Sequence, residues 1–203
     1  MNMKTRFAAG LLALAPALAW GNAGYLDLYY VPSAEFETAT GSDDGDGFGA
    51  KMLAPVGDGV LLSGEYQTSD YDDSGIESKQ FRVGLAFMGG DVLRFGVLGE
   101  YVDAELELPG LGKLATDGYG LHGRLELAPS ENLSLYGQGG VVKLKDDDGD
   151  RLDGPEYLVG LALALDPATG LFVEHRSTTL EDDDGDEIEF TDLRIGLRLQ
   201  LGR

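Results

Sequence analysis

The feature that most constrains the fold of this chain is an alternation of apolar and polar residues with a period of two. In residues 193–201 every odd position is Leu or Ile, and the even positions hold Arg194, Gly196, Arg198 and Gln200. Successive side chains of a β-strand point to opposite faces, so the pattern predicts strands with one apolar face. It recurs and predicts ten strands, over residues 24–31, 47–56, 60–68, 80–88, 92–103, 118–128, 133–143, 156–165, 170–178 and 191–201.

The connections between these strands are of two alternating kinds. Four are tight turns with Gly, Pro, Asp or Asn, at residues 57–59, 89–91, 129–132 and 166–169. Five are longer and mostly acidic, at residues 32–46, 69–79, 104–117, 144–155 and 179–190. Short turns at one end and long loops at the other are the layout of an up-and-down barrel. We therefore expect an all-β, antiparallel, up-and-down β-barrel of ten strands, with eight strands as the main alternative.

Composition narrows the classes of function. The 203-residue chain has no Cys, which excludes disulfides and thiolate metal sites. Its formal net charge of −21 repels nucleic acid, so we expect no nucleic-acid partner. The 31 Gly residues lie largely within apolar alternating runs, and we interpret them as strand-packing positions rather than as a flexible linker.

The first residues have the pattern of a secretory signal peptide. Lys4 and Arg6 precede an apolar stretch of about 12 residues, which is shorter than the ~20 residues that a spanning helix needs. Ala17-Leu18-Ala19 fits the small-x-small cleavage pattern. We expect a cleaved signal peptide over residues 1–19, with cleavage as late as residue 23 as the alternative, and a barrel domain over residues 20–203. Insertion into a membrane would then have to use strands.

The charges of the polar face distinguish a soluble barrel from a membrane barrel. A soluble barrel buries its apolar face, whereas a membrane barrel turns that face to lipid. Charges enclosed in a lumen need partners, because an unpaired buried ion costs several kcal/mol. The polar face is balanced, although the loops have a large acidic excess. We therefore predict an ion-paired lumen, in which seven basic residues oppose seven acidic ones: Lys51, Arg82, Arg94, Arg124, Arg176, Arg194 and Arg198, against Asp27, Glu65, Glu100, Glu126, Glu156, Glu174 and Asp192.

Aromatic residues of the apolar face gather near one end of the strands. A packed core would scatter aromatic side chains in depth, whereas a membrane barrel collects them at the lipid headgroups. Each of seven aromatic residues shares the apolar phase and lies toward a long loop. We predict that they form an aromatic girdle: Tyr30, Phe48, Tyr66, Phe81, Tyr101, Tyr119 and Tyr157.

The mature chain resembles the small outer-membrane barrels of the OmpA, OmpX and Opa type, the opacity or porin-like families. The most specific likeness is in the last strand, where Arg194-x-Gly196-x-x-Leu199-x-Leu201 matches the assembly signal polar-x-Gly-x-x-apolar-x-apolar. The families usually end in an aromatic residue, and this chain departs from them in ending Leu201-Gly202-Arg203. The resemblance implies a transmembrane barrel in the outer membrane of a Gram-negative bacterium, with short periplasmic turns and long acidic extracellular loops. It implies membrane lipid, lipopolysaccharide and the barrel-assembly machinery as partners.

Two acidic repeats in the predicted loops are candidate sites for a divalent cation. Their carboxylates offer the hard oxygen ligands that calcium accepts. The EF-hand spacing is not met, because its first ligand would fall on Leu144 or Leu180. A solvated acidic turn is the alternative. We expect no dedicated cofactor, and loosely bound Ca²⁺ or divalent bridges to lipopolysaccharide phosphates at these residues: Asp146, Asp148 and Asp150, and Asp182, Asp184 and Asp186.

Catalysis has one local candidate, His175 beside Glu174 near the loop end. Adjacent residues of a strand point apart, so these two side chains are not expected to meet. His122 lies on the polar face near Arg124 and Glu126, where we expect a structural role. We therefore expect a non-enzymatic barrel with a largely plugged lumen, which serves envelope integrity or surface interaction through its acidic loops. A narrow diffusion channel is the second hypothesis, and a hydrolase at the barrel rim is the third.

Overall fold

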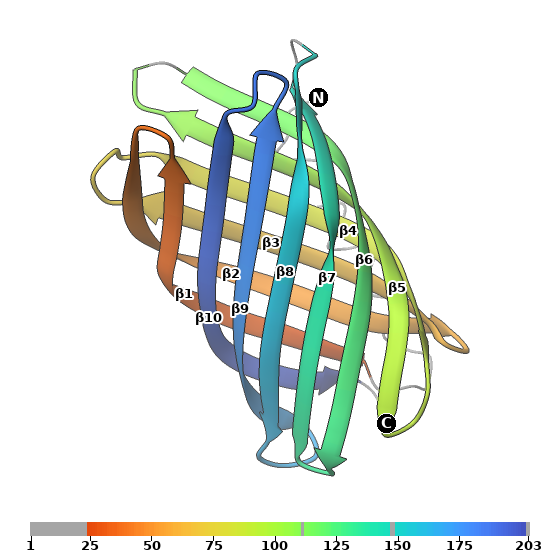
Figure 1. The fold of residues 1–203 in the computed structure, drawn as a ribbon. Helices are drawn as coiled ribbons and strands as arrows, with labels where there is room; N and C mark the ends of the chain where they lie inside the picture. The colour runs from red at the N-terminus through yellow and green to blue at the C-terminus, as the bar shows by residue number, and fades with distance from the viewer. Residues whose placement is uncertain (1–23, 111, 147–148, 202–203) are drawn as a thin grey trace, which may run out of the picture.

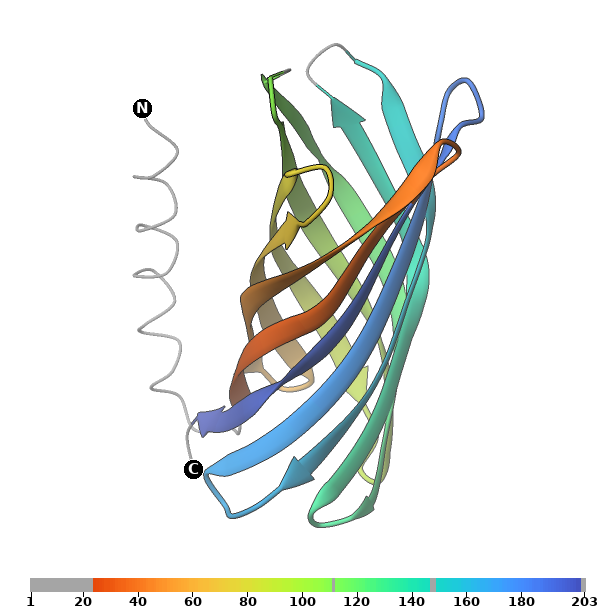
Figure 2. The same ribbon diagram turned by 90° about the vertical axis from the view of Figure 1, so that its left-hand side faces the viewer.

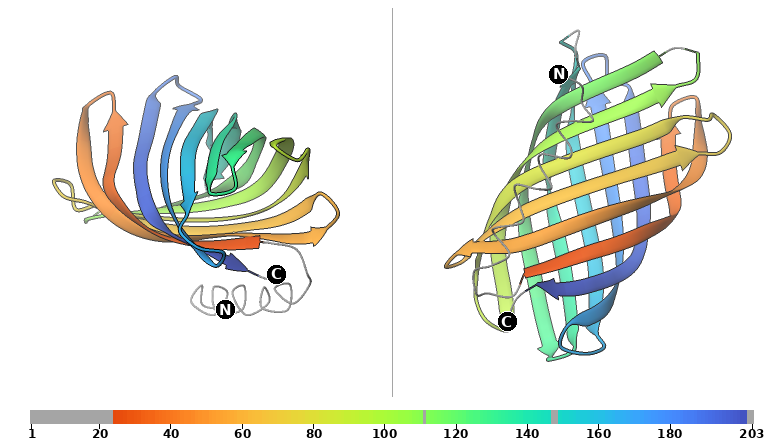
Figure 3. Two further views of the ribbon diagram at one scale, coloured as in Figure 1. Left: turned by 90° about the horizontal axis from the view of Figure 1, so that it is seen from below. Right: turned by 180° about the vertical axis from the view of Figure 1, so that it is seen from behind.

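The computed structural model describes residues 24–110, 112–146 and 149–201, and the predicted signal peptide lies outside these ranges. The described residues form an antiparallel barrel that closes by pairing β1 with β10 (Figure 1). Figures 2 and 3 show the strands wrapping obliquely around the barrel wall. The ten strands are β1 (Gly24–Thr38), β2 (Gly41–Gly57), β3 (Val60–Tyr71), β4 (Glu77–Gly89), β5 (Leu93–Leu108), β6 (Gly112–Ser130), β7 (Leu133–Asp146), β8 (Arg151–Ala164), β9 (Thr169–Asp182) and β10 (Glu187–Leu201).

The prediction of ten strands is confirmed, and the eight-strand alternative is wrong. Each predicted segment falls on one observed strand. Closure places Asp27 of β1 opposite Arg198 of β10, and Leu26 opposite Leu199. No strand edge is left unpaired in the closed sheet, which is the condition for crossing a bilayer with strands.

The prediction of five long acidic loops is wrong. At this end of the barrel, which we call the loop end, the described residues outside strands are only 39–40, 72–76, 109–110, 149–150 and 183–186. Backbone pairing continues through the acidic stretches, where Glu35 lies opposite Asp44 and Glu189 lies opposite Thr179. Charged residues can occupy one face of a strand as long as its backbone groups are paired and its other face packs. The acidic residues therefore lie largely on strands that extend the barrel.

The polarity of the two strand faces reverses along the barrel. On β10, Ile195 and Leu197 lie on the outside and are 42% and 51% exposed, whereas Arg194 is fully buried inside. Nearer the loop end of the same strand, Phe190 lines an internal cavity and Glu187 is exposed. The exterior is thus apolar in the middle of the barrel, as contact with lipid requires, and polar at the loop end, as contact with water requires.

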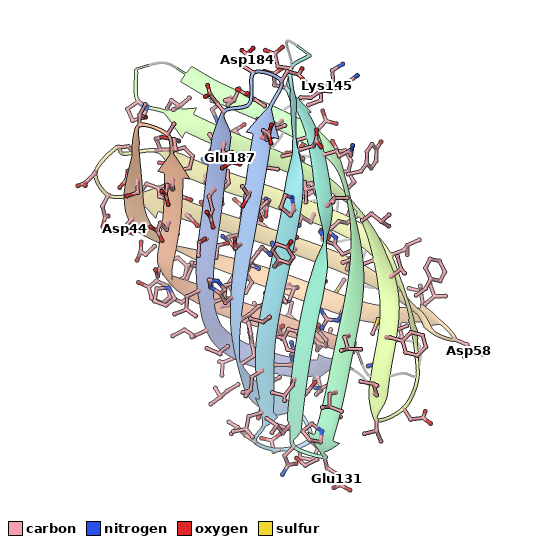
Figure 4. The ribbon with its side chains drawn as sticks, in the orientation of Figure 1. Asp44, Asp58, Glu131, Lys145, Asp184 and Glu187 are labelled. Atoms are coloured by element: carbon pink, nitrogen blue, oxygen red, sulfur yellow. The ribbon has the colours of Figure 1, made fainter. Side chains whose placement is uncertain are left out.

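Charged residues gather at the two ends of the barrel. Figure 4 shows Asp44, Lys145, Asp184 and Glu187 at the loop end, and Asp58 and Glu131 at the opposite end, which we call the turn end. The five segments once expected to be loops, residues 32–46, 69–79, 104–117, 144–155 and 179–190, carry 24 acidic and 4 basic residues, a net charge of −20. The described residues of these segments, which leave out Asp147 and Asp148, place a net charge of −18 at the loop end.

Apolar clusters lie inside the barrel above and below its middle. At the loop end, the Phe36 ring packs against Tyr71 and Phe190, with ring centroids 5.8 and 5.2 Å apart. Near the turn end, a second cluster includes Leu61 and Met88 of neighbouring strands. The polar part of the lumen is therefore bounded on both sides by apolar side chains.

Two inward-facing tyrosines lie flat against glycines of the adjacent strand. A Cβ atom added at Gly49 would come within 2.3 Å of the Tyr29 ring, and one added at Gly160 within 2.3 Å of the Tyr136 ring. The register places each glycine directly opposite its tyrosine. The absence of a side chain at these positions lets a large ring fit inside a narrow lumen.

We predict that Gly49→Ala lowers the free energy of unfolding by about 1–3 kcal/mol, because the methyl group overpacks against Tyr29. Urea titration of the protein refolded in phospholipid bilayers measures this change. Gly99→Ala is the matched control, since a Cβ atom there meets nothing within 4 Å. An equal loss of stability in both variants would contradict the role assigned to Gly49.

Candidate functional site: an ion-paired lumen

The middle of the lumen holds a charge-balanced group of buried side chains. They come from inward positions on nine strands and are held in place by the closed sheet around them. Arg194, Glu174 and Asp27 have no exposed surface, and Glu156 is 1% exposed. We call this group the lumen network. It consists of six basic residues, Lys51, Arg82, Arg124, Arg176, Arg194 and Arg198, and six acidic residues, Asp27, Glu65, Glu100, Glu156, Glu174 and Asp192.

Arg82 forms the clearest bridge across the lumen. From β4, its Nη1 and Nη2 atoms donate to Glu156 of β8 at 2.8 and 2.5 Å, and Nη1 also donates to Glu100 of β5 at 2.7 Å. Strands β4 and β8 are not neighbours in the barrel. A two-pronged contact between a guanidinium and a carboxylate is a strong and directional interaction. It therefore ties two opposite parts of the barrel wall together.

Glu65 and Glu174 organise a second bridge. Glu65 of β3 accepts from Arg194 of β10 at 2.8 Å and from Arg176 of β9 at 2.9 Å. Neither of these strands is a neighbour of β3 in the barrel. Glu174 accepts from Arg194 at 3.1 Å and forms an ion pair with Lys51 of β2. Each of these carboxylates thus meets two cations, which compensates for the loss of its hydration shell.

Asp27 and Arg198 pair between adjacent strands where the barrel closes. Arg198 Nε and Nη2 donate to the two carboxylate oxygens of Asp27, both at 2.8 Å. The guanidinium carbon also lies 3.8 Å from the centroid of the Tyr25 ring, an arrangement that attracts a cation to the ring face. This pair joins the first strand to the last.

Three residues predicted for the network lie at its turn-end margin. Arg94 Nη1 is 3.6 Å from Glu126, and the Arg94 side chain is 36% exposed. Arg124 Nη2 is 3.7 Å from Glu126, and the Arg124 guanidinium lies over the Tyr136 ring at 4.8 Å. Arg94 and Glu126 thus meet each other, and the structure does not bring them to the cross-lumen bridges.

Sequence reasoning missed the polar aromatic and amide groups that complete the network. The hydroxyl of Tyr29 donates to Glu65 at 3.1 Å, and that of Tyr136 donates to Glu174 at 3.1 Å. Gln67 Nε2 donates to Asp192 at 2.9 Å. A signal was present, because Tyr29 and Tyr136 share the phase of Asp27 and Gln138 rather than the apolar phase. The glycines opposite them marked the space that they occupy.

His122 lies inside the barrel, between Glu100 and Glu156 rather than beside Glu126. Its Nδ1 and Nε2 atoms are 3.6 and 3.2 Å from oxygens of these two carboxylates. Among the described residues, one group has the spacing of metal ligands, and it consists of Glu100, His122 and Glu156. The Arg82 guanidinium already bridges the same two carboxylates. The geometry therefore favours an arginine-centred cluster over a metal site.

The predicted girdle residues lie on the outer face, on the turn-end side of the level at which the polarity of the strand faces reverses. Tyr119, Phe48 and Tyr157 are 70%, 62% and 60% exposed. Neighbouring strands bring girdle residues into contact, with ring centroids 5.1 Å apart for Tyr30 and Phe48 and 5.8 Å apart for Tyr101 and Tyr119. Tyr66 and Phe81 lie opposite each other in register.

The acidic repeats form two similar turns at the loop end. Asp146 Oδ1 accepts from the backbone N–H groups of Gly149 and Asp150, and Asp182 Oδ1 accepts from those of Asp184 and Asp186. Asp148 lies outside the described residues. Carboxylates that accept from their own turn have a structural role there. Calcium binding at these aspartates stays a prediction.

The candidate catalytic pair is separated by the wall of the barrel. Glu174 is fully buried in the lumen network, whereas His175 is exposed on the outer face. Their side chains point apart, as alternation along a strand requires.

No family model and no curated protein sequence matches this chain. Solved structures share its fold. The outer membrane protease OmpT from Escherichia coli is 11% identical with a TM-score of 0.56, and the match covers 88% of this chain and 97% of that one. Neisserial surface protein A is 12% identical with a TM-score of 0.49, covering 88% and 98%. The attachment invasion locus protein Ail of Yersinia pestis is 15% identical with a TM-score of 0.40, covering 89% and 100%.

The chain therefore has the fold of the Gram-negative outer-membrane β-barrels. The similarity to OmpT extends over nearly the full length of both chains, and the apolar exterior of the barrel middle supports an outer-membrane location. Among the described residues, no helix is long and apolar enough to cross a membrane.

We predict that Arg82→Gln lowers the free energy of unfolding by about 3–5 kcal/mol, because Glu100 and Glu156 lose their shared counter-ion in a buried site. Lys79→Gln is the matched control on the barrel exterior, where Lys79 lies 3.0 Å from Glu77 and is 33% exposed. Lys79→Gln should lower the free energy of unfolding by less than about 1 kcal/mol, as for other exposed ion pairs. Urea titration in bilayers compares the two, and equal losses would argue against the bridging role of Arg82.

Proposed function

We propose that this chain is a non-enzymatic outer-membrane barrel whose lumen is closed to ions and whose acidic loop end is its working surface. The observation that carries the proposal is the set of ion pairs between non-adjacent strands, above all Arg82 with Glu156 and Arg176 with Glu65. These side chains meet across the space through which an ion would pass. The functions that fit such a barrel are envelope integrity and interaction with partners at the cell surface.

Closure is favoured by the energetics of the lumen network. An ion that entered would have to separate buried pairs, and a separated pair leaves two desolvated charges. It would also have to pass the apolar side chains that bound the network at both ends, such as Leu61 and Phe190.

A narrow diffusion channel is the second candidate, and one observation favours it. Two internal cavities, of about 80 and 40 Å³, lie on either side of the lumen network, and Arg82 and Arg176 line both. A conducting state would require these two side chains to move aside together. Both are held by carboxylates from other strands, which supports the closed state.

A hydrolase at the rim is the third candidate. One structural neighbour is a protease, but a similarity at this level of identity concerns the fold alone. The opposed directions of Glu174 and His175 support the non-enzymatic proposal. Wild-type hydrolytic activity that is lost in His175→Ala would overturn it.

We predict that the purified wild-type protein gives no stable channel steps in planar bilayers. Replacing both partners of one bridge, in Arg82→Ser with Glu156→Ser, shortens two opposed side chains and leaves Glu100 with His122 as its nearest basic neighbour. This double variant should give reproducible conductance steps. The matched control is Lys79→Ser with Glu77→Ser, an exterior pair 3.0 Å apart, which should conduct no more than wild type. Reproducible steps from the wild-type protein would overturn the closed lumen.

A further inference from the structure

The cavity nearer the loop end lies between the polar lumen network and the loop-end tips of the strands, and much of its wall is apolar. Its volume is about 80 Å³. It begins at the lumen network and reaches Leu114 and Ile188, which lie close to the loop-end tips of β6 and β10. Apolar side chains from strands on several sides line much of its wall, among them Leu106, Val142, Leu144, Leu152, Leu180 and Phe190, and polar side chains line it as well, namely Gln67, Ser78, Gln80, Thr116 and Thr178.

The floor of this cavity carries charged groups that are already neutralised. Arg82 and Arg176 line it, and they form ion pairs with Glu156 and Glu65. Asp192 also lines it and accepts from Arg194 at 2.9 Å. A ligand that enters from the loop end would therefore meet no net charge at the bottom, and its contact with the wall would be apolar.

The entrance to the cavity lies within the strongly acidic loop end. The described residues of the five segments around it include 22 acidic and 4 basic ones, a net charge of −18. Such a field concentrates cations and repels anions over about one Debye length. The barrel thus presents an acidic opening above an apolar pocket with a neutral floor.

We propose that this cavity is a binding site for small cationic amphiphiles, which are molecules with one apolar body and one positively charged head. The end of the apolar body lies between Leu106, Val142 and Phe190, because a cavity of about 80 Å³ holds only part of a short alkyl chain. The head stays at the loop end, within the field of the acidic segments. An anionic amphiphile meets repulsion at the same place, and a simple inorganic cation gains nothing from the apolar wall. The site lies above the lumen network, so it goes beyond the closed barrel and does not depend on whether the lumen conducts.

Isothermal titration calorimetry tests the proposal with hexyltrimethylammonium as the probe. The protein is held in nanodiscs of zwitterionic phosphatidylcholine, and empty nanodiscs supply the background heat. Saturable binding of hexyltrimethylammonium is expected, with hexanoate and tetramethylammonium at least about tenfold weaker. Raising the salt concentration from about 50 to about 500 mM should weaken its binding, because screening shortens the reach of the acidic field.

A cavity-filling variant locates the site. Ala104 lines the cavity on β5, so Ala104→Phe should weaken hexyltrimethylammonium binding at least about tenfold. Val97→Phe is the matched control, because Val97 lies on the same strand, points outward and is 51% exposed. The Val97→Phe variant should bind hexyltrimethylammonium as tightly as the wild-type protein does. If Ala104→Phe fails to fold, Ser78→Phe fills the same cavity from β4.

Several results would overturn the proposal. Absence of saturable hexyltrimethylammonium binding would remove the site, and equal binding by both Phe variants would place it elsewhere. Tetramethylammonium binding as tight as the amphiphile would show that the acidic surface acts without the cavity. Hexanoate binding as tight would remove the selectivity for cations. Conductance measurements on the same preparation report on the closed lumen separately.

Discussion

A charge that is enclosed in a narrow barrel must find its counter-ion inside that barrel, and the rest of this structure follows from that constraint. Water and salt cannot neutralise a buried guanidinium, so each one needs carboxylates within hydrogen-bonding distance. Five of the six basic side chains of the lumen network meet this need with its six carboxylates, whereas Arg124 lies over the Tyr136 ring. The hydroxyls of Tyr29 and Tyr136 donate further hydrogen bonds to Glu65 and Glu174. The acidic excess of the chain is confined to the loop end, where solvent can hydrate it.

The barrel wall extends from lipid into water, and the apolar side chains change from the outer to the inner face of the strands between the two. In the middle, apolar side chains meet lipid and charged ones fill the lumen. Toward the loop end, Leu144, Leu180 and Phe190 turn inward and the charges turn outward, as in a water-soluble barrel. The same continuous hydrogen-bonded sheet supports both arrangements, because backbone pairing does not depend on which face is apolar. The outer part is thus a folded extension, which can hold a surface site in a defined shape.

The closed middle and the hollow loop end together suggest how such a barrel is used. Salt bridges between non-adjacent strands cross the lumen, and in the proposed function they close it to ions. Two residues of the assembly motif in the last strand also contribute to the packing of the lumen. Arg194 belongs to the network, and a Cβ atom at Gly196 would meet Phe172 at 2.8 Å. In both proposals, recognition takes place at the loop end, above the lumen network.

The sequence by itself determined the number of strands, the face that each presents in the middle of the barrel, and the balance of charge on the polar face. Those properties follow from a period of two, which is local. It also contained the reversal of polarity, in which Leu106 and Leu108 take the opposite phase to Val97 and Tyr101, but the acidic composition of that stretch led us to expect a loop. Only the tertiary structure decided which charges meet. Arg82 pairs with Glu156, 74 positions away in the chain, rather than with Glu65, its register partner on β3. His122 likewise lies between Glu100 and Glu156. The physical reason is that a period of two fixes only the face on which a side chain lies, whereas the curvature of a closed, narrow barrel brings long side chains from opposite walls into contact.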